Sequence, residues 1–296
     1  MLKILLFGKN GQLGAELLRS LAVFGEVIAP ERGQSGGDLA NAADIRGAVL
    51  RVMPDIVVNA AAFTDVDAAE GQPDIARAIN ADAPALLARS CGETGAWFVH
   101  YSSDYVFDGS GGTRPWTEDD PARPLNAYGL SKLLGDQSVM QNCARHLIFR
   151  TSWLYAAHGE NFAKKILRRL RKDGQLTVVN DQFGVPTAAN WLADLTVVAL
   201  ARVLADERLA GLYHAAAAGE TSWHGYACFV VEQAQKTGLL AGVPINAVRP
   251  VASTAYEQTA RRPMNSRLDT SKLRRTFGLN PPDWQVGVAN VVEELA

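Results

Sequence analysis

The stretch KILLFGKNGQLG, residues 3–14, decides the fold, because an apolar run passes directly into three glycines spaced three residues apart. Residues 3–7 predict a buried strand, and a helical pattern follows over residues 12–22. Glycine permits a sharp turn and lets backbone N–H groups approach a phosphate at a helix N-terminus. The spacing is G-x-x-G-x-x-G instead of the commoner G-x-G-x-x-G, and a plain tight turn is the alternative. The position between strand and helix favours a dinucleotide-binding loop.

Strands and helices continue to alternate through the first half of the chain. Strand patterns follow at residues 26–29, 56–59, 97–101 and 146–151, and helical patterns at 41–52, 74–94 and within 124–143. Continuous apolar strands separated by helices are typical of a parallel sheet that is covered on both faces. The sequence therefore predicts an α/β protein with a Rossmann-type doubly wound parallel sheet.

The second half has a looser rhythm. It predicts helices at 161–172, 188–204 and 221–236, a strand at 176–179, and loops with two short helices in the last 50 residues, one near 270–277 and one at the C-terminus. We expect an NAD(P)-binding domain over 1–150, which also receives segments from about 180–205. Residues 151–296 should form mainly a smaller α/β substrate lobe, interleaved with the first domain.

Composition narrows the class of protein. The chain has 296 residues, of which 48% are hydrophobic and 20% charged, and its net charge of −2 gives no basic stripe for nucleic acid. No apolar stretch approaches the roughly 20 residues of a membrane helix. The histidines show no metal-binding spacing, and the odd, widely spaced cysteines suit a reducing compartment. We expect a cytoplasmic protein that binds neither nucleic acid nor membrane.

One basic cluster stands out from this neutral composition. Its six residues have helical spacing, so we interpret them as a solvated helix face, with a binding patch as the alternative; they are Lys164, Lys165, Arg168, Arg169, Arg171 and Lys172.

Several residues near the glycine loop are candidates for cofactor contacts. Glu31 follows the second strand pattern and favours the free ribose of NAD, whereas its neighbour Arg32 suits the additional phosphate of NADP, so both cofactors stay open. Asp38 and Leu39 are placed either in an adenine pocket, at the end of an additional short strand, or in a surface turn. The small residues 59–62 suit either the passage of a cofactor or helix packing.

Tyr128 and Lys132 are the candidate acid–base pair. Residues four apart lie on one face of a helix. A free phenol titrates near pKa 10, and a neighbouring ammonium favours the phenolate, so we expect Lys132 to lower the pKa of Tyr128 towards the range for carbonyl chemistry. Ser102 and Ser103 end a strand at the edge where ligands bind in such folds, where a hydroxyl can stabilise a developing alkoxide; caps and turns are the alternative role.

These motifs resemble the extended short-chain dehydrogenase/reductases and, within them, the dTDP-4-dehydrorhamnose reductase family. The resemblance covers nearly the whole chain, in the blocks GKNGQLG, VNAAAFTDVDAAE, HYSSDYVFDG, PLNAYGLSKLLGD, FRTSWLYA, NDQFGVPT, GLYHAAAAGETSWHGYA and RRPMNSRLD. It implies reduction of the 4-keto group of dTDP-4-dehydro-L-rhamnose (dTDP-6-deoxy-L-lyxo-4-hexulose) with NADPH or NADH. This would be the last step of dTDP-L-rhamnose synthesis, which serves a polysaccharide such as a bacterial O antigen.

The resemblance also implies roles for individual residues. Tyr128 would donate a proton to the C4 oxygen, Lys132 would also hold the nicotinamide ribose, and Ser103 stands where the family usually has threonine. The residues that fall on cofactor contacts are Gly8, Asn10, Gly11, Gln12, Leu13, Gly14, Glu31, Arg32, Asp38, Leu39, Ala62, Phe63, Thr64 and Tyr101. Those assigned to the sugar nucleotide are Asp104, Trp153, Arg262, Asn265 and Arg267, with a core position as the alternative for Trp153 and solvated loop positions for the last three.

The sequence also bears on metal dependence, on dimer formation and on two other functions. Some relatives are magnesium-dependent homodimers; here Glu16 and Glu293–Glu294 are available, but Asn190 stands where another glutamate would align, so we predict no metal site and leave a homodimer open. A related dehydratase or epimerase that keeps its cofactor bound is a second hypothesis. Sugar-nucleotide dehydratases place an Asp–Glu pair after the hydroxyl residue, whereas here Tyr105 follows Asp104. A non-catalytic regulatory subunit would not need the full set of Ser103, Tyr128 and Lys132.

Overall fold

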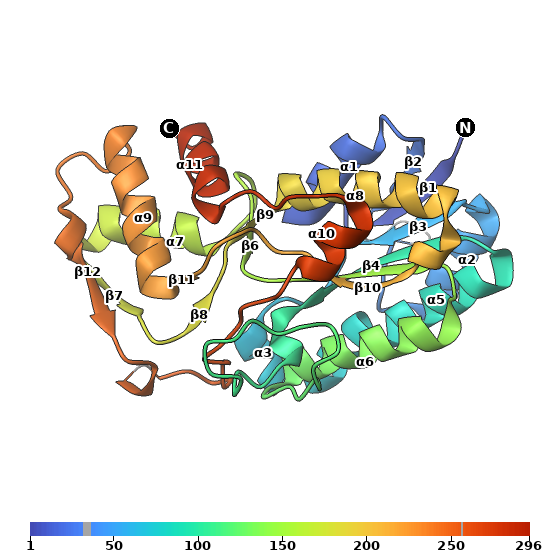
Figure 1. Cartoon of the computed structure of the whole chain (residues 1–296), viewed down its shortest axis with the longest axis horizontal. Coiled ribbons are helices and arrows are strands. Elements are labelled where there is room, and N and C mark those ends of the chain that lie inside the picture. The colour runs from blue at the N-terminus through green and yellow to red at the C-terminus, as the bar shows by residue number, and fades with distance from the viewer. Residues whose placement is uncertain (32–36, 256) are drawn as a thin grey trace.

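The computed structural model describes residues 1–31, 37–255 and 257–296 and has two lobes side by side (Figure 1). One lobe is built on a sheet with helices above and below it. The other contains three helices and several short strands, and the chain passes between the lobes more than once.

The central sheet contains six strands, and all of its strand pairs are parallel. Its spatial order is β10 (Gly211–His214), β5 (His146–Thr151), β4 (Trp97–Ser103), β3 (Ile56–Asn59), β1 (Lys3–Phe7) and β2 (Glu26–Ile28). The predicted doubly wound parallel sheet is confirmed. The sequence prediction did not include β10, whose short GLYH segment pairs with β5 at one edge.

Alternate side chains of the strands pack into two separate cores. Ile4 and Leu6 face one layer, formed by α1 (Gln12–Leu21), α8 (Ala189–Ala205) and α10 (Ser271–Phe277). Leu5 and Phe7 face the opposite layer, formed by α2 (Ala42–Val52), α5 (Ala83–Thr94) and α6 (Ala127–Asn142). Successive strand residues point to opposite faces, so this division explains the continuous apolar runs of the sequence.

The helix predicted over 74–94 is divided. It consists of α4 (Pro73–Arg77), a π-helical turn η1 (Ala78–Asp82) and α5, and a short helix α3 (Val66–Gly71) precedes it. Such π-helical turns are rare and often occur at functional sites. Gly135 of α6 lies so close to the Asn80 carbonyl in this turn that a Cβ would be 2.2 Å from that oxygen.

The second lobe surrounds a core of its own. Its helices are α7 (Phe162–Asp173), α9 (Trp223–Lys236) and α11 (Trp284–Glu294). Its short strands pair as β7 (Leu176–Val179) with β12 (Val248–Val251), β8 (Phe183–Gly184) with β11 (Thr221–Ser222), and β6 (Leu154–Tyr155) with β9 (Thr187–Ala188). The prediction of loops after residue 247 is wrong at β12, because Pro250 hides the strand signal in a two-stranded sheet.

Four short 3-10 turns complete the elements: η2 (Asp104–Val106), η3 (Glu207–Leu209), η4 (Ile245–Ala247) and η5 (Ser253–Ala255). Within residues 1–31, 37–255 and 257–296, no helix combines the length and apolar character needed to cross a bilayer.

Candidate active site

A cavity of about 560 Å³ opens at the carboxyl ends of β1, β3, β4 and β5. It brings the predicted glycine loop and the predicted catalytic side chains into one space. The lining residues are Gly8, Gly11, Gln12, Leu13, Ala60, Ala61, Ala62, Thr64, Val66, Tyr101, Ser102, Ser103, Asp104, Tyr105, Tyr128, Lys132, Thr151, Ser152, Trp153, Leu154 and Trp223. Ligands bind at this edge of open α/β sheets.

The three glycine positions of the loop differ in whether an added Cβ would collide with the rest of the chain. Gly8 has φ +86°, and a Cβ there would lie 2.6 Å from the Ala61 nitrogen. At Gly14 a Cβ would lie 1.9 Å from the Gly8 carbonyl oxygen. At Gly11, which precedes α1 with φ −79°, the nearest atom would be 3.4 Å away. Chain packing therefore requires glycine at positions 8 and 14 but not at position 11, where an added methyl group would face the cavity.

A smaller cavity of about 270 Å³ adjoins this loop and shares Gly8, Gly11, Ala61 and Ala62 with the first. Its other lining residues are Lys9, Asn10, Pro30, Gly37, Asp38, Leu39 and Ile79. Residues 37–40 form irregular chain and a turn, and the additional strand expected before them lies outside the described residues. Asp38 and Leu39 nevertheless line the cavity. The ammonium of Lys9 lies 3.0 Å from Glu31 Oε1, and Arg32 lies outside the described residues.

Tyr128 and Lys132 lie in the first two turns of α6, and both line the cavity of about 560 Å³. Asn126 caps this helix by accepting a hydrogen bond from the Gly129 N–H at 2.7 Å. The Lys132 ammonium is buried and donates to the Tyr101 carbonyl oxygen at 2.6 Å. Burial lowers the pKa of Lys132 to about 8, although Asp136 opposes this shift.

The expected effect of Lys132 on the phenol is wrong for this arrangement. Burial raises the pKa of Tyr128 to about 12, and a hydrogen bond with Ser103 opposes the shift only in part. The hydrogen bond of Lys132 is made to a backbone carbonyl, and burial is the largest influence on the pKa of the phenol. Tyr128 is therefore a protonated phenol at neutral pH.

Ser103 ends β4, and its hydroxyl contacts polar groups of Asp104, Tyr105 and Tyr128. Its hydroxyl donates to Asp104 Oδ1 at 2.9 Å and accepts from the Tyr105 N–H at 3.1 Å, in addition to its hydrogen bond with Tyr128. Burial raises the pKa of Asp104 to about 6, although the hydroxyls of Ser266 and Ser103 favour the carboxylate. The pair thus combines a hydroxyl and a carboxylate that titrates near neutrality.

Asn80 is a site residue that the sequence analysis missed. It is fully buried in η1; its Oδ1 accepts from the Phe63 N–H at 2.9 Å, and its Nδ2 donates to the Phe63 carbonyl oxygen at 2.9 Å and to Ser131 Oγ at 3.0 Å. The Ser131 hydroxyl donates to the Tyr128 carbonyl oxygen at 2.7 Å. Asn80 therefore connects the loop after β3 with the helix of Tyr128. Phe63 is not among the cavity-lining residues, whereas Ala62 and Thr64 are.

Trp153 has an unusual backbone and an aromatic partner. Its φ is +46°, a region that non-glycine residues rarely occupy. Its ring stacks on Trp223, with centroids 3.6 Å apart and planes 14° from parallel, and both rings line the larger cavity. Gly184 leaves room for this ring, since a Cβ there would lie 2.8 Å from it.

A second large cavity of about 750 Å³ is lined mainly by residues of the other lobe, and it also reaches Asp67 of α3 and Trp223. Four residues of the basic cluster line it, namely Lys165, Arg168, Arg169 and Lys172. Arg262 also lines it and donates to both carboxylate oxygens of Asp67, at 2.6 and 3.2 Å. The basic cluster is thus not only a solvated face, because most of its members surround a cavity.

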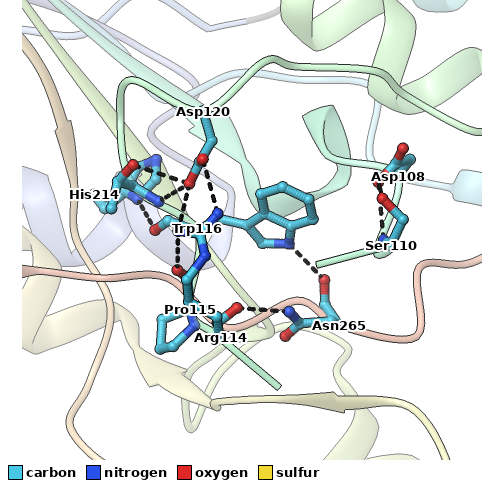
Figure 2. Close-up of polar contacts among 9 residues, drawn as sticks. Asp108, Ser110, Arg114, Pro115, Trp116, Asp120, His214 and Asn265 are labelled. Atoms are coloured by element: carbon cyan, nitrogen blue, oxygen red, sulfur yellow. Dashed lines mark hydrogen bonds and ion pairs between the residues drawn. The ribbon is translucent and has the colours of Figure 1, made fainter. Parts of the chain in front are cut away.

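Asn265 and Arg267 have different surroundings from Arg262. Figure 2 shows Asn265 against the segment of residues 108–120. Its side-chain Nδ2 donates to the Arg114 carbonyl oxygen at 2.8 Å, and its backbone carbonyl oxygen accepts from Trp116 Nε1 at 2.9 Å. Arg267 is bonded to Glu220 at 2.5 and 3.2 Å and lies over the Phe183 ring. Both side chains are buried, and neither lines the two large cavities; they fasten the chain beside the site.

Among the residues that the structure describes, no group of three or more His, Cys, Asp or Glu side chains could hold a metal ion. Glu16 lies in α1, Asn190 in α8 and Glu293–Glu294 at the end of α11.

Proteins in which a doubly wound sheet presents a tyrosine–lysine pair beside a dinucleotide loop form the extended short-chain dehydrogenase/reductase class, and this chain has that architecture. The profile of a family described as RmlD substrate binding domain matches residues 2–296. A dTDP-4-dehydrorhamnose reductase of Shigella flexneri is 48% identical over 297 residues, covering 99% of this chain and 98% of the relative.

Solved structures give the same result. The dTDP-4-dehydrorhamnose reductase of Clostridium acetobutylicum superposes with a TM-score of 0.89 at 34% identity, with 99% of each chain covered. That of Bacillus anthracis, in complex with NADP, has a TM-score of 0.87 at 31% identity, again with 99% of each chain covered. The chain belongs to the dTDP-4-dehydrorhamnose reductase family and is an oxidoreductase.

Proposed function

We propose that this enzyme reduces the C4 keto group of dTDP-4-dehydro-L-rhamnose to give dTDP-L-rhamnose, with NADPH as the preferred reductant and NADH as a second one. One observation carries the proposal: the glycine loop, Ser103, Tyr128 and Lys132 line the same cavity. The names of the relatives support the substrate, and the NADP complex of the Bacillus anthracis protein supports the cofactor.

The residues around the two adjoining cavities fit a dinucleotide. The backbone at Gly11–Leu13 presents the N-terminus of α1 to a pyrophosphate, and Gly11 leaves the approach open. Asp38 and Leu39 would hold the adenosine, and Ala62, Thr64 and Tyr101 the middle of the molecule. Lys9 lies where it can meet a ribose phosphate while it also offsets the charge of Glu31, which favours NADPH. When bound, the reduced cofactor supplies a hydride.

The side chains at the end of β4 and the start of α6 would complete the reaction. Tyr128, protonated at neutral pH, would donate its proton to the C4 oxygen as the hydride reaches C4. Ser103 would hold the same oxygen through its hydroxyl and stabilise the developing negative charge. Lys132 would hold the ribose hydroxyls, and Asp104 and Trp153 would contact the deoxysugar.

The cavity of about 750 Å³, which we call the basic cavity, would receive the thymidine diphosphate. It meets the cavity of about 560 Å³, the catalytic cavity, at Trp223. Arg262 and four cations of α7 supply the positive charge that a diphosphate requires. Asp67 holds the Arg262 fork in place. We assign Asn265 and Arg267 to the framework of the site, because neither side chain lines either of the two large cavities and both are bonded within the chain.

The test is a turnover assay with dTDP-4-dehydrorhamnose, run with NADPH and NADH side by side. The proposal predicts oxidation of one cofactor per product formed, and Tyr128→Phe should lower kcat about 10²- to 10⁴-fold. Tyr213→Phe is the matched control, since its hydroxyl donates to the Leu209 carbonyl outside the site and its loss should leave turnover intact. Absence of turnover, or full turnover by Tyr128→Phe, would disprove the assignment; product without net cofactor oxidation would indicate an epimerase or dehydratase.

A further inference from the structure

The side chain of Gln12 joins the glycine loop to the other lobe. Its Oε1 accepts two hydrogen bonds at 2.9 Å, one from the Ala156 N–H and one from Asn161 Nδ2. The same Asn161 nitrogen donates to the Ala156 carbonyl oxygen at 2.7 Å. Gln12 thus forms one closed cluster with two groups, Ala156 and Asn161, of a segment more than 140 residues later in the chain.

The packing around this cluster is tight. Gly159 has φ +70°, and a Cβ there would lie 2.8 Å from Cγ of Gln12. Asn161 is buried, and Gln12 is part-buried where it lines the catalytic cavity. The Gln12 side chain thus has little freedom to move without moving the segment before α7.

Asn161 passes this constraint to the basic helix. While its nitrogen binds Gln12, its Oδ1 caps α7 by accepting from the Lys164 N–H at 3.1 Å. The Lys164 ammonium donates to the Ala157 carbonyl oxygen at 2.7 Å, which fixes the first turn again. α7 carries Lys165, Arg168, Arg169 and Lys172 into the basic cavity, so their positions depend on how this helix begins.

We propose that Gln12 is a positioning residue that couples the two ligand sites. Its backbone belongs to the loop that closes on the phosphates of the dinucleotide, and its side chain holds the N-terminus of the helix that presents cations to the second diphosphate. Binding at one site therefore orders residues of the other site in advance and lowers the entropy cost of the second binding step. The coupling is reciprocal. The identities of both ligands rest on the proposed function; the coupling itself rests on the Gln12 contacts.

The experiment measures the Kd of dTDP by calorimetry, with and without saturating NADP⁺, which needs no turnover. Two hydrogen bonds of ordinary strength predict that NADP⁺ tightens dTDP binding by about fivefold or more. Gln12→Met keeps the side-chain length but removes the acceptor, and it should reduce this ratio to nearly one. Gln12→Glu keeps an acceptor oxygen for both donors and should retain the ratio. Asn161→Asp keeps the helix cap but removes the donor, and it should also lose the ratio.

A matched control is Gln235→Met, which removes a glutamine hydrogen bond to the Val243 carbonyl within the second lobe and should leave the ratio unchanged. A ratio near one in the wild-type protein, or a wild-type ratio in Gln12→Met or Asn161→Asp, would overturn the coupling. If the wild-type protein binds neither dTDP nor NADP⁺, the proposed function fails instead. Thermal unfolding of each variant separates loss of coupling from loss of fold.

Discussion

Replacing Gly11 and Gly14 separately by alanine distinguishes a glycine needed by a ligand from one needed by the chain. At Gly14 the new methyl group would lie 1.9 Å from the Gly8 carbonyl oxygen, and backbone cannot move aside without displacing α1. Overpacking of this kind costs about 3 kcal/mol or more, which corresponds to a fall in Tm of about 6 °C. At Gly11 the nearest atom is 3.4 Å away and φ is −79°, so the folded chain can accept alanine.

The stability of Gly11→Ala should therefore change little. Alanine is a poorer N-cap than glycine, but it also reduces the entropy of the unfolded chain, and these effects of about 0.5–1 kcal/mol each oppose one another. The methyl group would, however, stand in the space through which a pyrophosphate reaches the N-terminus of α1. We expect NADP⁺ affinity to fall about tenfold or more, equivalent to about 1.4 kcal/mol.

The two variants are compared by differential scanning calorimetry without ligand and by titration with NADP⁺. Gly14→Ala should lose thermal stability, and Gly11→Ala should keep it while losing affinity. Wild-type affinity in Gly11→Ala would refute the placement of the pyrophosphate on this loop. A wild-type Tm in Gly14→Ala would show that the Gly8 carbonyl can move away from a methyl group at position 14 without loss of stability.

Three further predictions concern individual side chains. Asp104→Asn should raise Tm at pH 7.5. Burial raises the folded pKa of Asp104 from 3.8 to about 6, so ionisation of this carboxyl costs about 3 kcal/mol of stability as pH rises through that window. The gain in Tm should vanish as pH falls through the same window in a pH series of melts. Arg262→Met should raise the KM for the sugar nucleotide about tenfold or more and leave kcat within about threefold. Arg261 is exposed, so Arg261→Met serves as the control. Equal KM values in the two variants would exclude Arg262 from the diphosphate site. Asn80→Ala removes the three hydrogen bonds of a buried side chain and should cost about 3 kcal/mol in urea unfolding. A loss below about 1 kcal/mol would show that Phe63 is held by other contacts.

The sheet could be predicted from sequence because its central strands carry continuous apolar runs, and each is followed by a helix. β10 and β12 were missed for the opposite reason. The GLYH segment of β10 is short and gains its place by pairing with β5, which lies about 60 residues earlier in the chain. β12 contains Pro250 and pairs only with β7. Such strands are defined by their partners, and a local pattern cannot identify those partners.

The catalytic corner could be predicted for a similar reason. Ser103 follows a strong strand and Tyr128 begins a strong helix, so the edge rule for parallel sheets places both near the glycine loop. The outer part of the site is different. Arg262, Asn265 and Arg267 lie in one polar loop and look equivalent in sequence, but only Arg262 faces a cavity, whereas the other two bond Arg114 and Glu220. A polar loop has the same composition whether it binds a ligand or fastens the chain.

The pKa of Tyr128 determines the protonation state in which the phenol would enter the proposed reaction. A lysine that lowers this pKa suits a base, which must lose its proton before it can act. Reduction of a ketone requires the reverse, an acid that still holds its proton when the carbonyl oxygen begins to gain charge. Burial raises the pKa of Tyr128 to about 12, and Ser103 stays within hydrogen-bond reach of the phenol. The phenol is thus protonated across the physiological range, and in the proposed reduction it would donate this proton to the oxygen at C4 as negative charge develops there.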